Sequence, residues 1–288
     1  KGDYGGSKLR FPLFGEGAGR WMGAPCVWNS FNNSWIHWSG EQRSRAQYAR
    51  DRFARYTQLA MGQPASHGRF VHLYLNGMYW GVYDLSERPT APFMASYYGG
   101  DKEDYDALNS GEVRDGDKNA WNTMMSMANA GLAGDAQYQA IQEYLDVDNL
   151  IDFIITNHYG ANHDWDGHNW YAGRRREESA GYQFFCWDSE RILEGVRDNI
   201  LGVNNNDKPS RLYQQLRANA EFRLLFADHL HRHFFNDGAL TPQAAADRWR
   251  AISEPMDLVI VAESARWGDY RRDVHSWSSG PYELYTKS

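Results

Sequence analysis

The chain of 288 residues is long enough for one large domain or for two lobes with a cleft between them. A hydrophobic content of 42% and a charged content of 23% are ordinary for a globular protein. The formal net charge of −7 lacks the basic excess that a nucleic-acid-binding surface requires, and no apolar run is long enough to span a membrane.

The first 88 residues are predicted to be rich in β-structure. Before residue 62 we expect a strand over 8–14, a glycine-rich loop over 15–23 and a helix over 41–61. Gly62 and Pro64 provide the signals that end this helix. A β-hairpin over 69–87 is the clearest local prediction, because apolar and polar residues alternate on both sides of Asn76-Gly77, the preferred type I′ turn.

From residue 89 onward the chain is predicted to be mostly helical. Helical periodicity is present over 119–130, 136–145, 147–159, 210–218, 220–235 and 242–267. Asp146 and Asp148 lie where an N-cap belongs for the third of these helices, which leads directly into the loop that contains Asp164. The fold class is therefore expected to be α+β with two parts, 1–88 and 89–288, arranged like the two lobes of a protein kinase.

Two features bear on the context of the chain. It begins at Lys1 in a glycine-rich stretch, which is typical of a domain excised from a longer protein. Cys26 and Cys186 are the only cysteines and form no CxxC pair, so zinc-ribbon and thioredoxin-type motifs are excluded. Their spacing is compatible with one disulfide and with two buried thiols.

The segment 162–190 carries three oxygen-bearing side chains in a pattern typical of phosphoryl transfer. Asp164 is followed at Asp-x-x-x-x-Asn spacing by Asn169, which begins an aromatic-rich strand, and a second strand-like run ends at Asp188. The polar stretch 174–180 predicts a hairpin turn that brings Asn169 beside Asp188. Transfer from ATP requires a carboxylate that accepts the hydroxyl proton and oxygen ligands for Mg²⁺ or Mn²⁺.

These residues also have ordinary structural interpretations. A lone Asp after a strand is usually a turn former or a helix cap, and Asp-x-x-x-x-Asn spacing often occurs by chance. Asp166 offers a second carboxylate in the same loop and competes with Asp164 for the role of base. His163 is predicted to orient the loop by hydrogen bonding rather than to act as a base.

The chain resembles the spore coat protein H (CotH) kinase family of secreted, atypical kinases. The strand–Asn-Gly–strand hairpin and the Trp-Asp strand are fairly specific to that family, and together the similar stretches span most of the chain. They are RFVHLYLNGMYWGVYDLSERP (69–89), NHDWDGHNWYAGRR (162–175), FFCWDSE (184–190), HFFNDGALTP (233–242) and AESARWGDYR (262–271).

The resemblance implies an atypical kinase-like two-lobed fold and an ATP-dependent phosphotransferase that uses Mg²⁺ or Mn²⁺. It further implies Ser/Thr hydroxyls of extracytoplasmic proteins as substrates, and a secreted or cell-surface location. By residue, Asp164 resembles the catalytic base, Asn169 a metal ligand and Asp188 the metal-binding Asp of the family. Glu87 is expected in the connector between the lobes, on the nucleotide side.

The chain departs from the family pattern at the basic residue that holds the nucleotide phosphates. Family members often carry Arg or Lys in the strand before the Asn-rich loop, whereas this chain has Trp28 near that position. Lys8, Arg10 and Arg20 are the candidate substitutes. Loss of one preorganised cation would lower the rate by on the order of 10²–10³, which motivates a second hypothesis: a catalytically degenerate surface, adhesion or binding module.

Two other kinds of site remain open. The aromatic content of 15% is compatible with a glycan-binding domain. The HxHxH sequence at His229, His231 and His233 places only the first and third imidazoles on one helix face, with Asp228 as the acidic neighbour. A partly exposed helix face is the ordinary interpretation of this motif, and zinc is the alternative.

Overall fold

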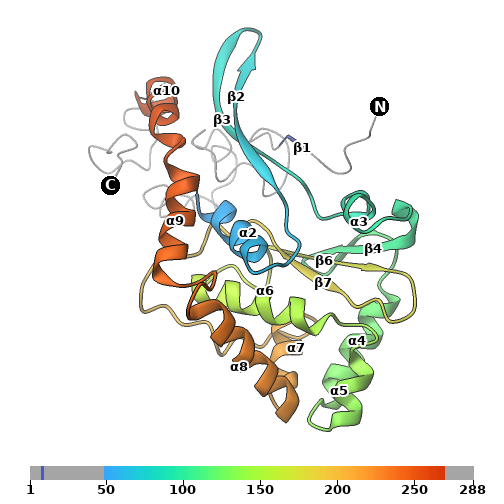
Figure 1. Cartoon of the computed structure of the whole chain (residues 1–288). Coiled ribbons are helices and arrows are strands. Elements are labelled where there is room, and N and C mark those ends of the chain that lie inside the picture. Colours follow the sequence, from blue (N-terminus) through green and yellow to red (C-terminus); the bar gives the residue numbers. More distant parts are fainter. Residues whose placement is uncertain (1–7, 10–48, 270–288) are drawn as a thin grey trace, which may run out of the picture. The chain divides into compact units, whose positions relative to one another are not determined.

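A computed structural model describes residues 8–9 and 49–269 of the chain (Figure 1). Over these residues the protein is α+β, which confirms the predicted fold class and is compatible with a kinase-like two-lobed fold. The predicted glycine-rich loop, the strand around Trp28, Cys26, and the positions of Arg10 and Arg20 lie outside the described residues. The described residues group into two compact units.

The smaller unit includes β1 (Lys8–Leu9), β2 (Gly68–Leu75), β3 (Met78–Ser86) and α10 (Met256–Asp269), with strand order β1-β3-β2. The two central turn residues, Asn76 and Gly77, have φ of 50° and 79°, as a type I′ turn requires. The hairpin predicted over 69–87 is therefore present. Arg266 of α10 donates from Nε to the carbonyl oxygen of Tyr79 at 3.1 Å, which fastens the helix to β3.

The prediction of a single helix over 242–267 is wrong. The structure has two helices there, α9 (Pro242–Ser253) and α10, separated by a turn at 254–255. Pro255 explains the break, because proline has no N–H to donate and its ring clashes with the preceding helical turn.

The larger unit, Arg50–His67 with Glu87–Arg248, contains a four-stranded antiparallel sheet in the order β5-β4-β6-β7. Its strands are β4 (Tyr105–Asn109), β5 (Glu112–Asp115), β6 (Trp170–Arg175) and β7 (Gln183–Cys186). The β6–β7 hairpin is the one that the sequence predicts. Strands β4 and β5 were not expected; Ser110 and Gly111, with φ of 55° and 92°, form their connecting turn.

The helices of this unit are α2 (Arg50–Ala60), α3 (Ala91–Tyr98), α4 (Asn119–Ala130), α5 (Asp135–Ile141), α6 (Val147–Gly160), α7 (Pro209–Leu216) and α8 (Ala220–Phe234), with a short 3₁₀ helix at Lys102–Asp104. Asp146 caps α6 as predicted, since its carboxylate accepts a hydrogen bond from the Asn149 N–H at 2.9 Å. Helix α5 ends earlier than predicted, because Tyr144 and Asp146 instead exchange backbone hydrogen bonds with Tyr182.

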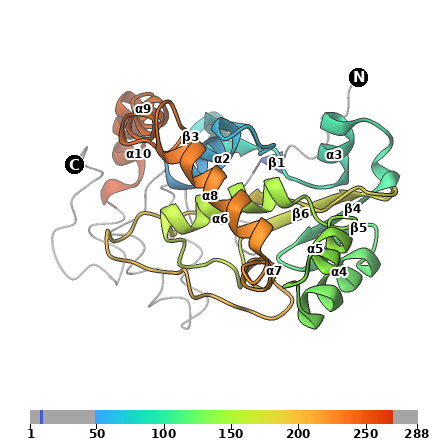
Figure 2. The ribbon, with the colours of Figure 1, turned by 60° about the horizontal axis from the view of Figure 1, so that its bottom comes forward.

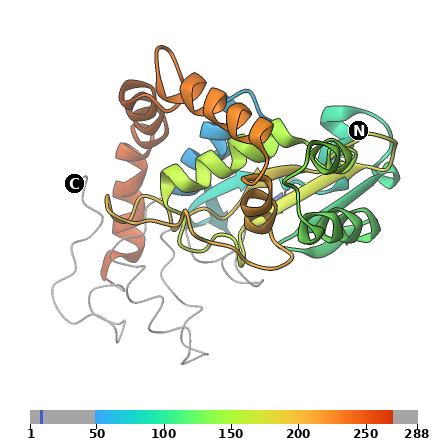
Figure 3. The ribbon, with the colours of Figure 1, turned by 90° about the horizontal axis from the view of Figure 1, so that it is seen from below.

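The sheet is covered on both faces, with α3 on one side and α6 on the other (Figure 1). Phe185 of β7 meets Phe93 of α3 in an edge-to-face contact with ring centroids 5.6 Å apart. Its neighbour Phe184 points to the other face and lies 5.5 Å from Phe153 of α6. This alternation places two hydrophobic layers around the β6–β7 hairpin. Helix α8 lies alongside α6 on the side away from the sheet (Figures 1 and 3).

The outer edge of β7 is closed by side chains. Gln58 of α2 donates from Nε2 to the carbonyl oxygen of Phe184 at 2.6 Å and accepts from the Cys186 N–H at 2.9 Å. Asn149 of α6 accepts from the Phe184 N–H at 2.5 Å. Both amide side chains are fully buried, so they replace the strand partner that an edge strand lacks.

Replacing Gln58 with Leu is expected to lower the free energy of unfolding by about 2–4 kcal/mol. The substitution keeps the side-chain volume but leaves a buried carbonyl oxygen and a buried N–H without partners. Urea unfolding of the two proteins measures the difference. The matched control is Gln139→Leu on the exposed side of α5, which should change stability by less than about 0.5 kcal/mol. Equal effects of the two substitutions would contradict this account.

Candidate functional site

Helix α6 ends at the loop that carries the first candidate residues. Its last residue, Gly160, lies against Ile192, and a Cβ there would be 2.9 Å from the Ile192 Cβ. The next residue, Ala161, adopts left-handed geometry with φ of 46° and turns the chain out of the helix. Buried Asn162 then donates to the Asn157 side-chain oxygen at 2.9 Å and accepts from the Asp164 N–H at 3.2 Å. The position of Asp164 is thus set from α6.

Asp164 and Asn169 lie in direct contact. The Asn169 Nδ2 donates to the Asp164 Oδ2 at 3.3 Å, and the Asp164 Oδ1 lies 3.9 Å from Nη1 of Arg191. The Asp164 side chain is 19% exposed, so its carboxylate is held in place but remains accessible from solvent. The Asp-x-x-x-x-Asn spacing therefore corresponds to a real pair of neighbouring side chains.

Asn169 and Asp188 flank the same end of the β6–β7 hairpin. Trp170, the residue after Asn169, is paired in register with Cys186, two residues before Asp188. Asn169 and Asp188 both have left-handed backbones, with φ of 68° and 55°. Such conformations cost free energy in residues other than glycine and often occur where function fixes a side-chain direction.

Glu190 is a residue of this region that the sequence reasoning did not identify. Its side chain is buried, and its carboxyl group lies within hydrogen-bonding distance of the Asp164 carboxylate, whereas no N–H or hydroxyl of the described residues donates to either oxygen. Burial, together with the negative charges of Asp188 and Asp164, raises the pKa of Glu190 well above its ordinary value. The available signal was the second carboxylate in the sequence Trp-Asp-Ser-Glu.

Helix α2 reaches the same segment from the other side. Its Asp51 accepts a hydrogen bond from the Ser189 N–H at 2.9 Å, and the Arg50 guanidinium donates to the Glu190 carbonyl oxygen at 3.5 Å. The turn 188–190 is therefore held both by the strand that precedes it and by the first residues of α2.

Asp166 is placed differently from Asp164. Its carboxylate is fully buried and accepts hydrogen bonds from Asn205 Nδ2 at 2.7 Å and from the Ser210 N–H at 2.6 Å, at the first turn of α7. Burial raises the pKa of Asp166 despite these bonds. Both of its oxygens are occupied in joining the loop to α7, which lies on the α6 side of the sheet (Figure 2).

The other predicted residues have partners of their own. His163 lies with Nε2 2.8 Å from the Asp198 carboxylate, and its backbone N–H donates to the Arg191 carbonyl oxygen. Glu87 follows β3 and accepts from the Tyr97 hydroxyl at 2.8 Å and from the His67 N–H at 3.0 Å. Burial, reinforced by Glu87, raises the pKa of Tyr97 to about 12. Arg10 and Arg20 lie outside the described residues.

The interpretation of the HxHxH sequence as a partly exposed helix face is wrong for two of its members. His229 and His233 are buried against Asp152 of α6, whereas His231 is exposed. The acidic partner is therefore not Asp228, the neighbour in sequence, but a residue 77 positions away. Sequence spacing within α8 carries no information about it.

The region around Asp164 carries the ligand types of a hard divalent cation. Asn169, Asp188 and Glu190 have amide and carboxylate oxygens, the ligand class of Mg²⁺ and Mn²⁺. A cation would also satisfy the buried Glu190 carboxylate and offset the repulsion among the acidic groups.

The described residues contain no helix whose length and apolar character would let it cross a bilayer.

Comparison with known proteins adds an independent finding. The family model described as CotH kinase protein matches residues 46–285, which is most of the chain. A search of curated proteins found no match. On the strength of that family match, the chain belongs to the CotH kinase family.

Proposed function

We propose that the chain is an ATP-dependent phosphotransferase that modifies Ser/Thr hydroxyls of extracytoplasmic proteins from a secreted or cell-surface location. Family membership supports a kinase-like function. The observation that carries the finer proposal is the contact between Asp164 and Asn169, at the end of the hairpin that also presents Asp188. These are a base and two metal-binding oxygens at the spacing that phosphoryl transfer from ATP uses.

In this proposal Asp164 accepts the proton of the substrate hydroxyl. Its partly exposed carboxylate is oriented by the Asn169 amide and by its own backbone bond to Asn162, so little reorganisation is needed when the substrate arrives. Mg²⁺ or Mn²⁺ would neutralise the charge of the phosphates when bound. Asn169, Asp188 and Glu190 are the residues that would hold it.

Asp164 rather than Asp166 is assigned as the base. Asp166 is buried, and both of its oxygens are occupied by Asn205 and the N-terminal turn of α7. A carboxylate in that position holds the loop but does not reach a substrate hydroxyl. His163 contributes through the contacts that connect the loop to Arg191 and Asp198.

A degenerate binding module is the second candidate, favoured by Trp28 at the position where a basic residue is expected. The glycan-binding hypothesis requires exposed aromatic side chains. Four tryptophans of the larger unit are buried and do not support it: Trp121, Trp165, Trp170 and Trp187. These side chains pack in the core or beside the loop and offer no exposed stacking platform.

Replacing Asp188 with Asn is expected to abolish the divalent-dependent stabilisation by ATP. In the wild-type protein, ATP and Mn²⁺ at about 100 times the dissociation constant should stabilise the fold by about 2.7 kcal/mol, visible as a higher melting temperature. The matched control is Asp237→Asn in the exposed turn after α8, which should keep the full shift. An Asp188→Asn protein with an unchanged shift would refute the assignment.

Replacing Asp164 with Asn is expected to lower phosphate transfer or ATP turnover by about 10²–10⁴-fold while retaining the ATP-dependent melting shift, because it removes the proton acceptor and preserves the shape of the side chain.

Replacing Asp166 with Asn should instead lower the free energy of unfolding by about 1–3 kcal/mol, with turnover per folded molecule much less affected. Turnover and urea unfolding are measured on both variants. The reverse pattern would transfer the base role to Asp166, and no turnover in the wild-type protein would favour the binding module.

Replacing Glu190 with Gln is expected to stabilise the metal-free protein at neutral pH, because it removes a buried carboxylate that faces Asp188 and Asp164. The free energy of unfolding should rise by roughly 1–3 kcal/mol, which is visible as a higher melting temperature. The same substitution should weaken the Mn²⁺-dependent shift with ATP. Differential scanning fluorimetry with and without Mn²⁺ tests both effects. A variant that is less stable without metal would show that Glu190 is a structural residue.

A further inference from the structure

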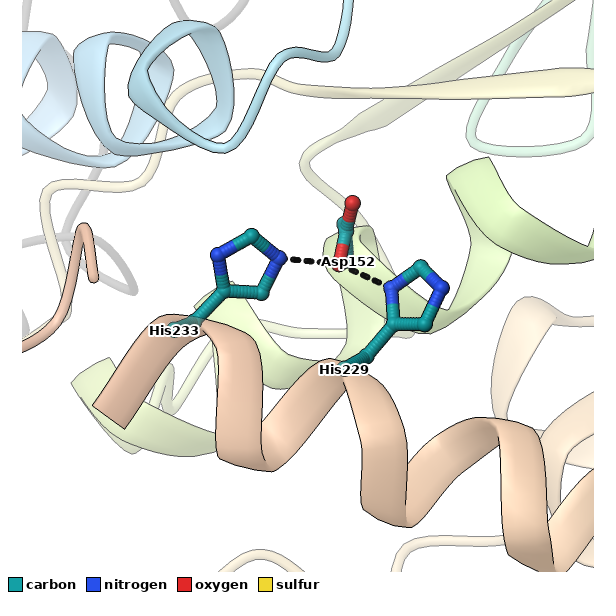
Figure 4. Close-up of side chains that lie close together, drawn as sticks. All are labelled: Asp152, His229 and His233. Atoms are coloured by element: carbon teal, nitrogen blue, oxygen red, sulfur yellow. Dashed lines mark hydrogen bonds and ion pairs between the residues drawn. The ribbon is translucent and has the colours of Figure 1, made fainter. Parts of the chain in front are cut away.

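A second group of metal-ligating side chains lies in the contact between α6 and α8, on the side of α6 away from the sheet. Asp152 projects from α6 between His229 and His233 of α8 (Figure 4). The Asp152 Oδ1 lies 2.7 Å from Nδ1 of His229 and 2.9 Å from Nε2 of His233. All three side chains are buried, and one donor atom from each falls within 4.8 Å of the others.

The outer contacts of this group resemble those around bound metal ions. The second ring nitrogen of His229, Nε2, lies 2.9 Å from the Asp148 Oδ1. Histidines that bind a metal through one nitrogen commonly donate from the other to a carboxylate. The Asp152 Oδ2 accepts from Gln63 Nε2 at 2.8 Å, and Gln63 accepts in turn from Asn149. The ligand atoms are therefore oriented by a fixed second set of side chains.

The nitrogens of the two histidines meet carboxylate oxygens from α6. Both nitrogens of His229 face such oxygens, Nδ1 that of Asp152 and Nε2 that of Asp148. The same oxygen of Asp152 is shared with His233. A metal ion bound by Nδ1 of His229, Nε2 of His233 and Oδ1 of Asp152 would leave the Nε2–H of His229 to donate to Asp148.

We propose that Asp152, His229 and His233 form a binding site for a transition-metal dication of the Zn²⁺ class, which joins α6 to α8. Two imidazoles and one carboxylate suit Zn²⁺ and related ions, whereas Mg²⁺ and Ca²⁺ prefer an all-oxygen set. Ligand atoms around tetrahedral zinc lie about 3.3 Å apart, so each imidazole would move by roughly half an ångström. The site is separate in residues and in chemistry from Asn169 and Asp188, and it does not depend on the phosphotransferase proposal.

The test measures zinc binding by the whole chain after removal of metal with EDTA. The protein is reloaded with ZnCl₂, and bound zinc is counted by mass spectrometry after gel filtration; CoCl₂ replaces it for absorption spectroscopy. We expect one zinc per chain, a higher melting temperature, and a visible Co²⁺ spectrum typical of tetrahedral nitrogen and oxygen ligands. Millimolar Mg²⁺ should leave the zinc bound. Absence of stoichiometric zinc in the reloaded wild-type protein would overturn the proposal.

Variants locate the ion. His233→Gln should weaken zinc binding by at least 10–100-fold, whereas His231→Gln, on the exposed face of the same helix, should bind like the wild type. Asp148→Asn changes a largely exposed side chain and so should fold even if the buried substitution does not; it should weaken binding about 10-fold. Asp188→Asn should bind zinc normally. Wild-type affinity in both His233→Gln and Asp148→Asn would refute this site.

Discussion

The requirement that the outer edge of β7 be hydrogen-bonded governs the larger unit. Gln58 and Asn149 meet it from two helices, and so α2 and α6 become fixed to the same strand. Two residues beyond that edge the chain reaches Asp188, and Asp51 of α2 holds the turn through Ser189. The backbone position of a candidate metal ligand is therefore set by a buried strand edge.

The residues around Asp164 are arranged at a cost to stability. Asn169 and Asp188 adopt left-handed backbones, and Glu190 is buried beside two other carboxylates. Sites with such strain and like-charge repulsion are retained when binding or catalysis depends on them. Asp166, in contrast, contributes to stability, because its hydrogen bonds to Asn205 and to the start of α7 hold the loop that carries Asp164. Two carboxylates, two residues apart, thus differ in role because one is buried and hydrogen-bonded and the other is partly exposed.

The sequence predicts features whose causes are local. The Asn76-Gly77 turn, the Asp146 cap and the β6–β7 hairpin follow from neighbouring residues. It could not reveal the contact of Asp152 with α8, which joins residues 77 positions apart, nor the environment that raises the pKa of Glu190. Strands β4 and β5 were missed because their short segments lack clear alternation, and Pro255 was a visible signal that was overlooked. Long-range packing, rather than propensity, decides the contact of Asp152 with α8 and the environment of Glu190, whereas the break at Pro255 has a local cause.

The buried thiol of Cys186 can be used to measure local opening of the larger unit. Cys186 is a free cysteine and is fully buried, and burial raises the pKa of its thiol well above the ordinary value, so the thiol stays protonated at neutral pH. Its backbone N–H is held by Gln58 of α2, and its sulfur lies 3.9 Å from Nδ2 of Asn157 in α6, so a reagent reaches the sulfur only when the packing around β7 opens. The rate at which an alkylating agent labels Cys186, in a protein with Cys26 changed to Ser, therefore reports how often this packing opens.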